Sequence, residues 1–352
     1  MYDLKDLLQR SIEENASDVH FTVGKPPCYR IDGVLSAIEG ERLMPDTLKE
    51  LLLPIMEERH REELKRDGQT DFAYAIAGVG RFRVNVFQQR GTLASVMRCL
   101  PFEIPEPQSL GIPKEVVEVT DRKRGLVLVT GPTGSGKSTT LASLLHVINQ
   151  KYPYHIITLE DPIEYLHRHD KSIVNQREIG SDSGSYGAAL RAALREDPDV
   201  ILVGEMRDLE TISTAITAAE TGHLVFSTLH TIGADKTIDR IIDVFPPDQQ
   251  QIRIQLAAVL ECVVSQQLIR KEHGGRVAAL EVLFANNAVR NLIREGKTFQ
   301  IPSVMQTSRR AGMITMDDAL YDLFMKGEIG EEAVVTYAQD PVAMNRKVNF
   351  EI

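Results

Sequence analysis

The segment GPTGSGKST, residues 131–139, combines glycines, a lysine and hydroxyl side chains in the pattern GxxxxGK[ST]. Glycines let backbone N–H groups curl around phosphate oxygens, the lysine neutralises the β- and γ-phosphates, and the serine hydroxyl is a ligand for Mg²⁺. An apolar run precedes the segment and leucines at helical spacing follow it, which favours a phosphate-binding loop over a chance glycine-rich turn. We therefore expect ATP and Mg²⁺ here, with nucleotide contacts from Gly131, Pro132, Thr133, Gly134, Ser135, Gly136, Lys137, Ser138 and Thr139.

Three polar side chains stand at the ends of predicted apolar strands. Glu160 follows HIITL, Glu205 follows VILVG and His230 follows LVFSTL. Ligands of parallel α/β sheets bind outside the carboxyl ends of the strands. We therefore expect Glu160, Glu205 and His230 to face the phosphates as catalytic residues.

The two glutamates have the chemistry that ATP hydrolysis requires. Hydrolysis needs a water aimed at the γ-phosphate and a carboxylate that holds Mg²⁺ directly or through water. Glu205 resembles a Walker B carboxylate whose preceding aspartate has become Gly204, so we expect Glu205 and Ser138 to hold the metal. Glu160 is predicted to polarise the attacking water, although the pattern does not decide which glutamate orients it. A helix-capping or surface acid is the alternative for each.

The histidine admits three interpretations. A lone histidine at a strand end is typical of a hydrogen-bonded core residue. A metal site would need a cysteine or a second histidine at helical spacing, and His223 lies seven positions earlier. Beside a phosphate loop, His230 can donate to a γ-phosphate oxygen that ATP has and ADP lacks. We expect His230 to sense the nucleotide state, with His223 as a candidate second contact.

A predicted hairpin places two arginines side by side. If Arg90 and Gly91 form a two-residue turn, Arg83 lies opposite Arg98. Like charges in that position destabilise a hairpin unless an anion bridges them, and the arginine fork suits phosphate. Arg83 and Arg98 are therefore catalytic candidates that reach a nucleotide at a domain or subunit boundary. Solvated strand arginines, or partners of acidic residues, are the alternative, and a register slip would separate the two.

Composition limits the class of protein. The 352 residues exceed what one core usually serves, so two domains are expected. A formal charge of -10 argues against binding to duplex nucleic acid. The three cysteines, Cys28, Cys99 and Cys262, form no CxxC pair and indicate neither zinc nor disulfides. Because no signal peptide or apolar run long enough to span a membrane is present, a cytoplasmic protein is expected.

Four prolines within residues 101–113 predict a semi-rigid linker between residues 1–100 and 114–352. Before it, the pattern predicts an antiparallel α+β domain, with helices at 2–15 and 46–66 and strands within 18–24, 27–35, 70–78, 80–89 and 92–100. After it, apolar strands alternate with helices, which indicates a parallel α/β sheet covered on both faces. An α-rich tail is expected, with helices at 234–245, 248–269, 287–295 and 316–326, and Thr315 and Asp318 are spaced as a capping pair.

The motifs ASDVHF, GPTGSGKST, TLEDPIEY, GEMRD and TGHLVFSTLHT together resemble the secretion-ATPase superfamily across essentially the whole chain. The segment AVRNLIREGK, 288–297, is similar to the AIRNLIREGK motif of the type IV pilus retraction ATPases, with Val289 replacing isoleucine. Val289, Leu292 and Ile293 are also simple core positions of a helix. Extension ATPases generally carry an additional N-terminal domain and a tetracysteine zinc insertion, neither of which is expected here.

This resemblance implies an N-terminal PAS-like domain followed by a RecA-like P-loop ATPase domain with a C-terminal helical retraction region. It implies a homohexamer whose interdomain movement powers pilin disassembly and twitching motility at the cytoplasmic face of the inner membrane. The implied partners are a PilC-like platform protein and a paralogous retraction ATPase, with no nucleic acid. Members use N-terminal arginines to complete the nucleotide site, here Arg83 and Arg98, with Arg81 as a substitute.

Several other functions share these motifs. An assembly or type II secretion ATPase of the same superfamily and a hexameric DNA translocase have the same core. A small-molecule kinase would need an acceptor pocket. A scaffold would bind nucleotide without hydrolysing it.

Overall fold

The computed structural model describes residues 2–31, 33–100, 103–246 and 249–350. These divide into two compact units, Met1–Glu103 and Ile104–Ile352. Residues 101–102 of the predicted linker and residue 248, where a predicted helix begins, lie outside the described residues.

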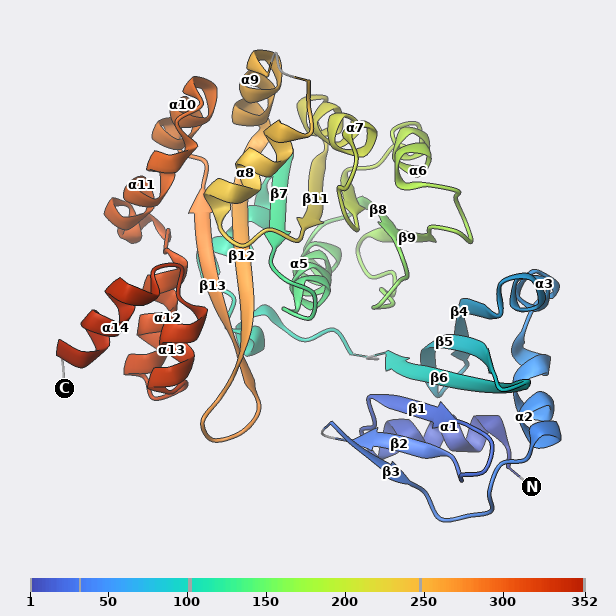
Figure 1. The fold of residues 1–352 in the computed structure, drawn as a ribbon. Helices are drawn as coiled ribbons and strands as arrows, with labels where there is room; N and C mark the ends of the chain where they lie inside the picture. The colour runs from blue at the N-terminus through green and yellow to red at the C-terminus, as the bar shows by residue number, and fades with distance from the viewer. Residues whose placement is uncertain (1, 32, 101–102, 247–248, 351–352) are drawn as a thin grey trace. The chain divides into compact units, whose positions relative to one another are not determined.

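The N-terminal unit is a six-stranded antiparallel sheet with helices packed on it (Figure 1). Its strands follow the order β3-β2-β1-β6-β5-β4. Apolar side chains from the helices and from alternate strand positions form one core, which includes Leu8, Val19, Leu48 and Val84. The strands are β1 (Asp18–Phe21), β2 (Cys28–Ile31), β3 (Val34–Ala37), β4 (Gln69–Ile76), β5 (Gly80–Gln89) and β6 (Thr92–Leu100), and the first helix is α1 (Leu4–Glu13).

The β5–β6 hairpin confirms the predicted register. Arg90 and Gly91 both have positive φ, 48° and 75°, as a two-residue hairpin turn requires. Arg83 consequently pairs with Arg98 across the two strands.

The helix predicted at 46–66 is wrong as one element. The structure has α2 (Pro45–Leu52), a 3₁₀ turn (Leu53–Ile55) and α3 (Glu58–Asp67). Pro54 lacks the N–H that a continuing helix would need, so α2 ends before it.

The second unit is built on a seven-stranded sheet in the order β13-β12-β7-β11-β10-β8-β9. All neighbouring pairs are parallel except β12 with β13. The strands β7, β10 and β11 are buried along their whole length, which explains their continuously apolar sequences. The bounds are β7 (Gly125–Thr130), β8 (His155–Glu160), β9 (Ile173–Glu178), β10 (Val200–Val203), β11 (Leu224–Leu229), β12 (Leu260–Arg270) and β13 (Arg276–Phe284).

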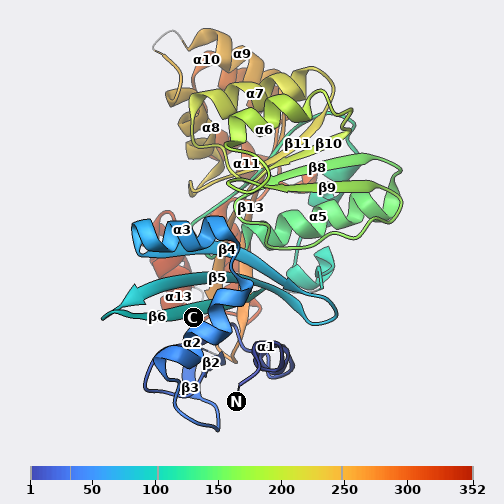
Figure 2. The same cartoon turned by 90° about the vertical axis from the view of Figure 1, so that its right-hand side faces the viewer.

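Helices cover both faces of this sheet. Figure 2 shows α5 (Lys137–Lys151) on one side of β8 to β11, and α6 (Tyr186–Ala193) and α7 (Leu209–Glu220) on the other. Short helical turns, including α4 (Lys114–Val117), share the face of α5. The face of α6 and α7 continues into α8 (Ala234–Asp243), α9 (Gln250–Val259), α10 (Asn287–Glu295) and α11 (Ile301–Thr307).

The helix predicted at 248–269 is wrong beyond residue 259. The chain leaves α9 at Val259 and enters β12 at Leu260, without an intervening glycine or proline. The strands β9 and β13 were also not predicted. As a consequence, the predicted α-rich tail contains the two strands at one edge of the sheet.

A small separate core holds the C-terminal helices against β12 and β13. It contains α12 (Met316–Met325), α13 (Glu331–Tyr337) and α14 (Pro341–Phe350). The predicted cap of α12 is confirmed, because the Thr315 hydroxyl accepts a hydrogen bond from the Asp318 amide. Within the described residues, no helix has the length and apolarity needed to span a membrane.

Candidate active site

The loop of residues 131–136 joins the end of β7 to the start of α5. Gly131, Gly134 and Gly136 have φ values of 140°, 79° and 90°, which side-chain-bearing residues rarely adopt. The Lys137 ammonium folds back over the loop and donates to the carbonyls of Gly131 and Pro132 at 2.9 and 3.0 Å. Burial lowers the pKa of Lys137, and Glu164 and Glu205 oppose that shift. The loop and the helix N-terminus thus bring an ammonium group and backbone N–H donors together, which suits an anion.

Gln266 of β12 is a supporting residue that the sequence patterns did not identify. Its side-chain amide donates to the Ser135 carbonyl and accepts from the Thr140 hydroxyl. A Cβ atom at Gly131 would lie 2.1 Å from the Gln266 carbonyl oxygen, so only glycine fits there. The side chain of Gln266 therefore ties the phosphate loop to β12. The incorrect helix prediction across 260–269 concealed this residue.

Glu160 is the last residue of β8 and lies among neutral donors. Its Oε1 accepts hydrogen bonds from the Thr158 hydroxyl at 2.7 Å and the Gln176 amide at 3.1 Å. Burial raises the pKa of Glu160 to about 7, and the Thr158 and Gln176 hydrogen bonds oppose part of the shift. A carboxyl group with that pKa can accept a proton from water at neutral pH.

Gly204 sets the approach of β10 to β8. Its N–H donates to the Leu159 carbonyl at 2.8 Å. A Cβ atom there would lie 2.8 Å from the Tyr186 hydroxyl, 3.0 Å from that carbonyl oxygen and 3.4 Å from the Glu160 Cα. The glycine that replaces the usual aspartate is therefore required by packing between the two acidic strand ends.

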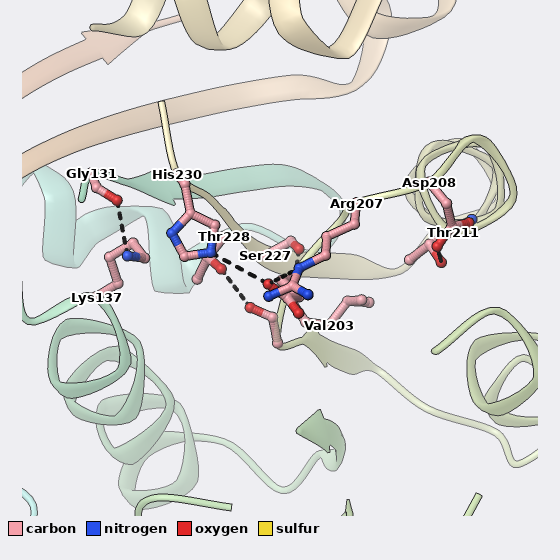
Figure 3. Close-up of polar contacts among 11 residues, drawn as sticks. Gly131, Lys137, Val203, Arg207, Asp208, Thr211, Ser227, Thr228 and His230 are labelled. Atoms are coloured by element: carbon pink, nitrogen blue, oxygen red, sulfur yellow. Dashed lines mark hydrogen bonds and ion pairs between the residues drawn. The ribbon is translucent and has the colours of Figure 1, made fainter. Parts of the chain in front are cut away.

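Glu205 lies among cationic and ionisable nitrogen groups. Its Oε2 is 2.7 Å from the Arg207 Nε and 3.4 Å from the His230 Nε2 (Figure 3). The Thr228 hydroxyl of β11 fixes the preceding backbone by donating to the Gly204 carbonyl. The structure thus brings Glu205, His230 and the Lys137 loop to one edge of the sheet, because β7, β10 and β11 end there together.

His223 is not brought to this edge. It precedes β11 at the opposite end of the strand from His230, and its Nδ1 lies 2.9 Å from the Ala218 carbonyl oxygen. The six residues of β11 span roughly 20 Å. Within this unit, His223 serves as an anchor between α7 and β11.

The predicted arginines belong to the N-terminal unit. Arg98 donates from Nε to the Asp18 carboxylate at 3.0 Å, and the β1–β6 register places these two residues opposite each other. Arg83, on the other side of Arg98, is exposed. Arg98 thus has an acidic partner within its own unit. The reach of either arginine to a nucleotide stays a prediction.

The donor set fits Mg²⁺. Ser138, the second residue of α5, and Glu205, two residues beyond β10, carry oxygen atoms of the kind that hard cations prefer and would hold the ion. No cluster of three His, Cys, Asp or Glu side chains suited to a metal occurs in the part of the chain that the structure describes.

The fold and this site define a P-loop nucleotide-binding protein. Residues 2–318 match the family model described as type II/IV secretion system protein. The chain is 48% identical over 340 residues to the type IV pilus retraction ATPase PilT of Pseudomonas aeruginosa, covering 96% of this chain and 99% of that one. It is 45% identical over 346 residues to a twitching motility protein of Neisseria gonorrhoeae, covering 98% and 92%.

A solved structure of the pilus retraction motor PilT with bound ADP superimposes with a TM-score of 0.93 at 52% identity, covering 98% of this chain and 100% of that chain. The chain belongs to the PilT family of type II/IV secretion system ATPases.

Proposed function

We propose that the protein is an ATP-hydrolysing motor that retracts type IV pili. The observation that carries the proposal is that Glu160 and Glu205 lie at the carboxyl ends of the adjacent strands β8 and β10, with Glu205 near enough to Lys137 to oppose the lowering of the Lys137 pKa by burial. Similarity over nearly the whole chain to a pilus retraction ATPase supports retraction. Residues 288–295 of the segment 288–297 lie on α10, where Val289 and Ile293 are buried and other side chains remain accessible to partners.

The two glutamates have separate roles in this proposal. Glu160, with its raised pKa and neutral donors, accepts the proton of the water that attacks the γ-phosphate. Glu205, held by Arg207 and facing His230, is the carboxylate that serves the metal. Bound Mg²⁺ would neutralise the charge of the β- and γ-phosphates. The different environments of the two carboxylates support this division of roles, which the sequence left open.

The remaining groups bind and report the nucleotide. Lys137 exchanges its loop carbonyls for phosphate oxygens, and backbone N–H groups of residues 133–138 surround the phosphates. His230 donates to the γ-phosphate and releases it after hydrolysis. Arg83 and Arg98 complete the site across a domain or subunit boundary in a homohexamer.

Mechanical work in this proposal comes from movement between the two units about the proline-rich segment 101–113. It acts on an inner-membrane platform protein, so that pilin subunits leave the pilus base. A paralogous retraction ATPase is a further proposed partner. The protein works at the cytoplasmic face of the inner membrane.

Two measurements test the proposal. ATP hydrolysis by the purified protein should release inorganic phosphate without labelling an acceptor, and Glu205→Gln should abolish turnover while nucleotide still binds. A labelled product would support a kinase, and undiminished turnover in Glu205→Gln would contradict the assigned role. Deletion of the gene should give hyperpiliated cells without twitching, whereas bald cells would indicate an assembly ATPase.

A further inference from the structure

Glu281 of β13 is a buried carboxylate that lies outside the proposed reaction. Only 3% of the residue's surface is exposed. Oε1 accepts a hydrogen bond from the Ala234 amide at 2.6 Å, and Oε2 accepts from the Met316 amide and the Gln339 side chain, both at 3.0 Å. Burial raises the pKa of Glu281, and these donors oppose the shift. A carboxylate buried this deeply is costly unless it is hydrogen-bonded, and these three hydrogen bonds offset part of that cost.

The partners of Glu281 belong to three separate segments. Ala234 is the first residue of α8, Met316 is the first residue of α12, and Gln339 follows α13. The carboxylate therefore joins the positive N-terminal ends of two helices, which favours its ionised form. In Figure 1, α8 lies across one end of β12 while α12 to α14 lie beside β13.

The start of α8 is only four residues beyond His230. The intervening loop is anchored to the same strand pair, because the Gly233 amide donates to the Ser265 hydroxyl at 3.0 Å and Ser265 pairs with Glu281. The Thr231 and Thr237 hydroxyls are 2.7 Å apart, and Thr237 in turn donates to the Gly233 carbonyl. The loop that carries His230 is thus fixed at both ends.

Gly233 also brings this loop against the C-terminal segment. Its φ of 103° favours glycine, and a Cβ atom there would lie 3.4 Å from the Gln339 side-chain nitrogen. Gln339 is held in turn, because its backbone amide donates to the Asp317 carboxylate at 2.6 Å. A displacement of α12 or of the segment after α13 would therefore shift the loop between His230 and α8.

We propose that Glu281 is a positioning residue that fixes His230 at the phosphate site and links its position to the C-terminal helices α12 to α14. This inference rests on the proposed role of His230. The link works in both directions, since one carboxylate holds both helix starts. A change in His230 on ATP binding is transmitted to the start of α12.

The test replaces Glu281 with glutamine, whose NH₂ group cannot accept from one of the two helix amides. Because a small misplacement of a catalytic group is costly, kcat for ATP hydrolysis should fall on the order of tenfold, while the Kd of a non-hydrolysable ATP analogue changes less than about twofold. Glu261→Gln is the matched control, because the Glu261 carboxylate on β12 pairs with Arg122 and Arg290 and not with a helix start. The control should retain the wild-type kcat.

Hydrogen–deuterium exchange distinguishes positioning from a general loss of stability. In wild type, the analogue should slow exchange at the phosphate loop, at residues 230–238 and at residues 314–320. In Glu281→Gln, protection of the phosphate loop should remain and that of residues 314–320 should be lost. Unchanged kcat together with wild-type protection at 314–320 would overturn the inference, even when the wild type hydrolyses ATP as proposed.

A milder variant keeps the inference testable if Glu281→Gln does not fold. Gln339→Ala leaves both backbone hydrogen bonds to Glu281 in place and removes the third. It should lower kcat about two- to threefold and weaken nucleotide-dependent protection at 314–320. Wild-type values of both quantities in this variant would contradict the link through Gln339.

Discussion

Substitution of Thr158 by valine tests whether Glu160 is the proton acceptor. Thr158 is fully buried and donates to Glu160 Oε1 at 2.7 Å, and valine keeps its shape within β8 while removing the hydroxyl. A hydrogen bond to a charged group is worth about 1.5–3 kcal/mol, and one pKa unit corresponds to 1.36 kcal/mol. Loss of the bond should therefore raise the pKa of Glu160 by about one unit from its value of about 7.

The assay is phosphate release across pH 5.5 to 9, plotted as kcat/KM because that ratio reports groups of the free enzyme. If ionised Glu160 is required, the wild-type ratio rises about tenfold between pH 6 and pH 8, as the ionised fraction grows from about 9% to about 91%. In Thr158→Val the midpoint should move upward by about one unit. At pH 7 this lowers kcat/KM about fivefold.

Two controls isolate the protein's contribution. ATP ionises identically with either enzyme, so a difference between the midpoints belongs to the protein. Thr158→Ser retains a hydroxyl and should keep the wild-type midpoint. A folded Thr158→Val protein whose midpoint equals that of wild type would refute the assignment of Glu160 as the base.

Three further predictions follow from the same geometry. Glu160→Gln should raise the free energy of unfolding at pH 8 by about 3 kcal/mol in denaturant titrations, and should leave it unchanged near pH 4.5. The reason is that the raised pKa of Glu160 makes wild-type stability fall as pH rises from 4.5 to about 7. Equal stability of the two proteins at pH 8 would contradict the burial argument. Gly204→Ala should destabilise the protein by about 1–3 kcal/mol and lower kcat, since the alanine Cβ would crowd the Tyr186 hydroxyl. Adding Tyr186→Phe should restore part of the stability and part of kcat. If it restores neither, the Leu159 carbonyl is the dominant clash. Gln266→Leu should weaken binding of a fluorescent ATP analogue about tenfold in equilibrium titrations, because the phosphate loop loses its hydrogen bonds to Gln266. Gln267→Leu, which loses only a contact to the Tyr337 carbonyl, should bind the analogue with wild-type affinity. Equal affinities of the two variants would show that Gln266 does not support the phosphate loop.

Sequence patterns predicted the centre of the site because each signal was local. The glycines of the loop, the apolar strands before Glu160 and Glu205, and the hairpin turn at Arg90 are each encoded within about ten consecutive residues. Parallel pairing then requires the strand ends to meet, without any knowledge of side-chain contacts. The role of Gly204 could not be read in this way, because the atoms that exclude a Cβ there belong to Tyr186 and Leu159, which are distant in sequence.

The edge of the second sheet escaped prediction for a different physical reason. At Val259 a helix passes directly into a strand, and apolar residues continue across the junction from Leu256 to Leu260, so no turn residue marks the boundary. The strands β12 and β13 also carry polar residues at buried positions, Ser265, Gln266 and Glu281, which a pattern of hydrophobic residues does not explain. These polar side chains form hydrogen bonds with the phosphate loop and with the starts of α8 and α12, which explains why they are buried. A buried polar side chain needs a hydrogen bond, and these partners lie as far as 131 residues away along the chain. The part of the molecule that was hardest to predict is therefore the part that connects the nucleotide site with the C-terminal helices.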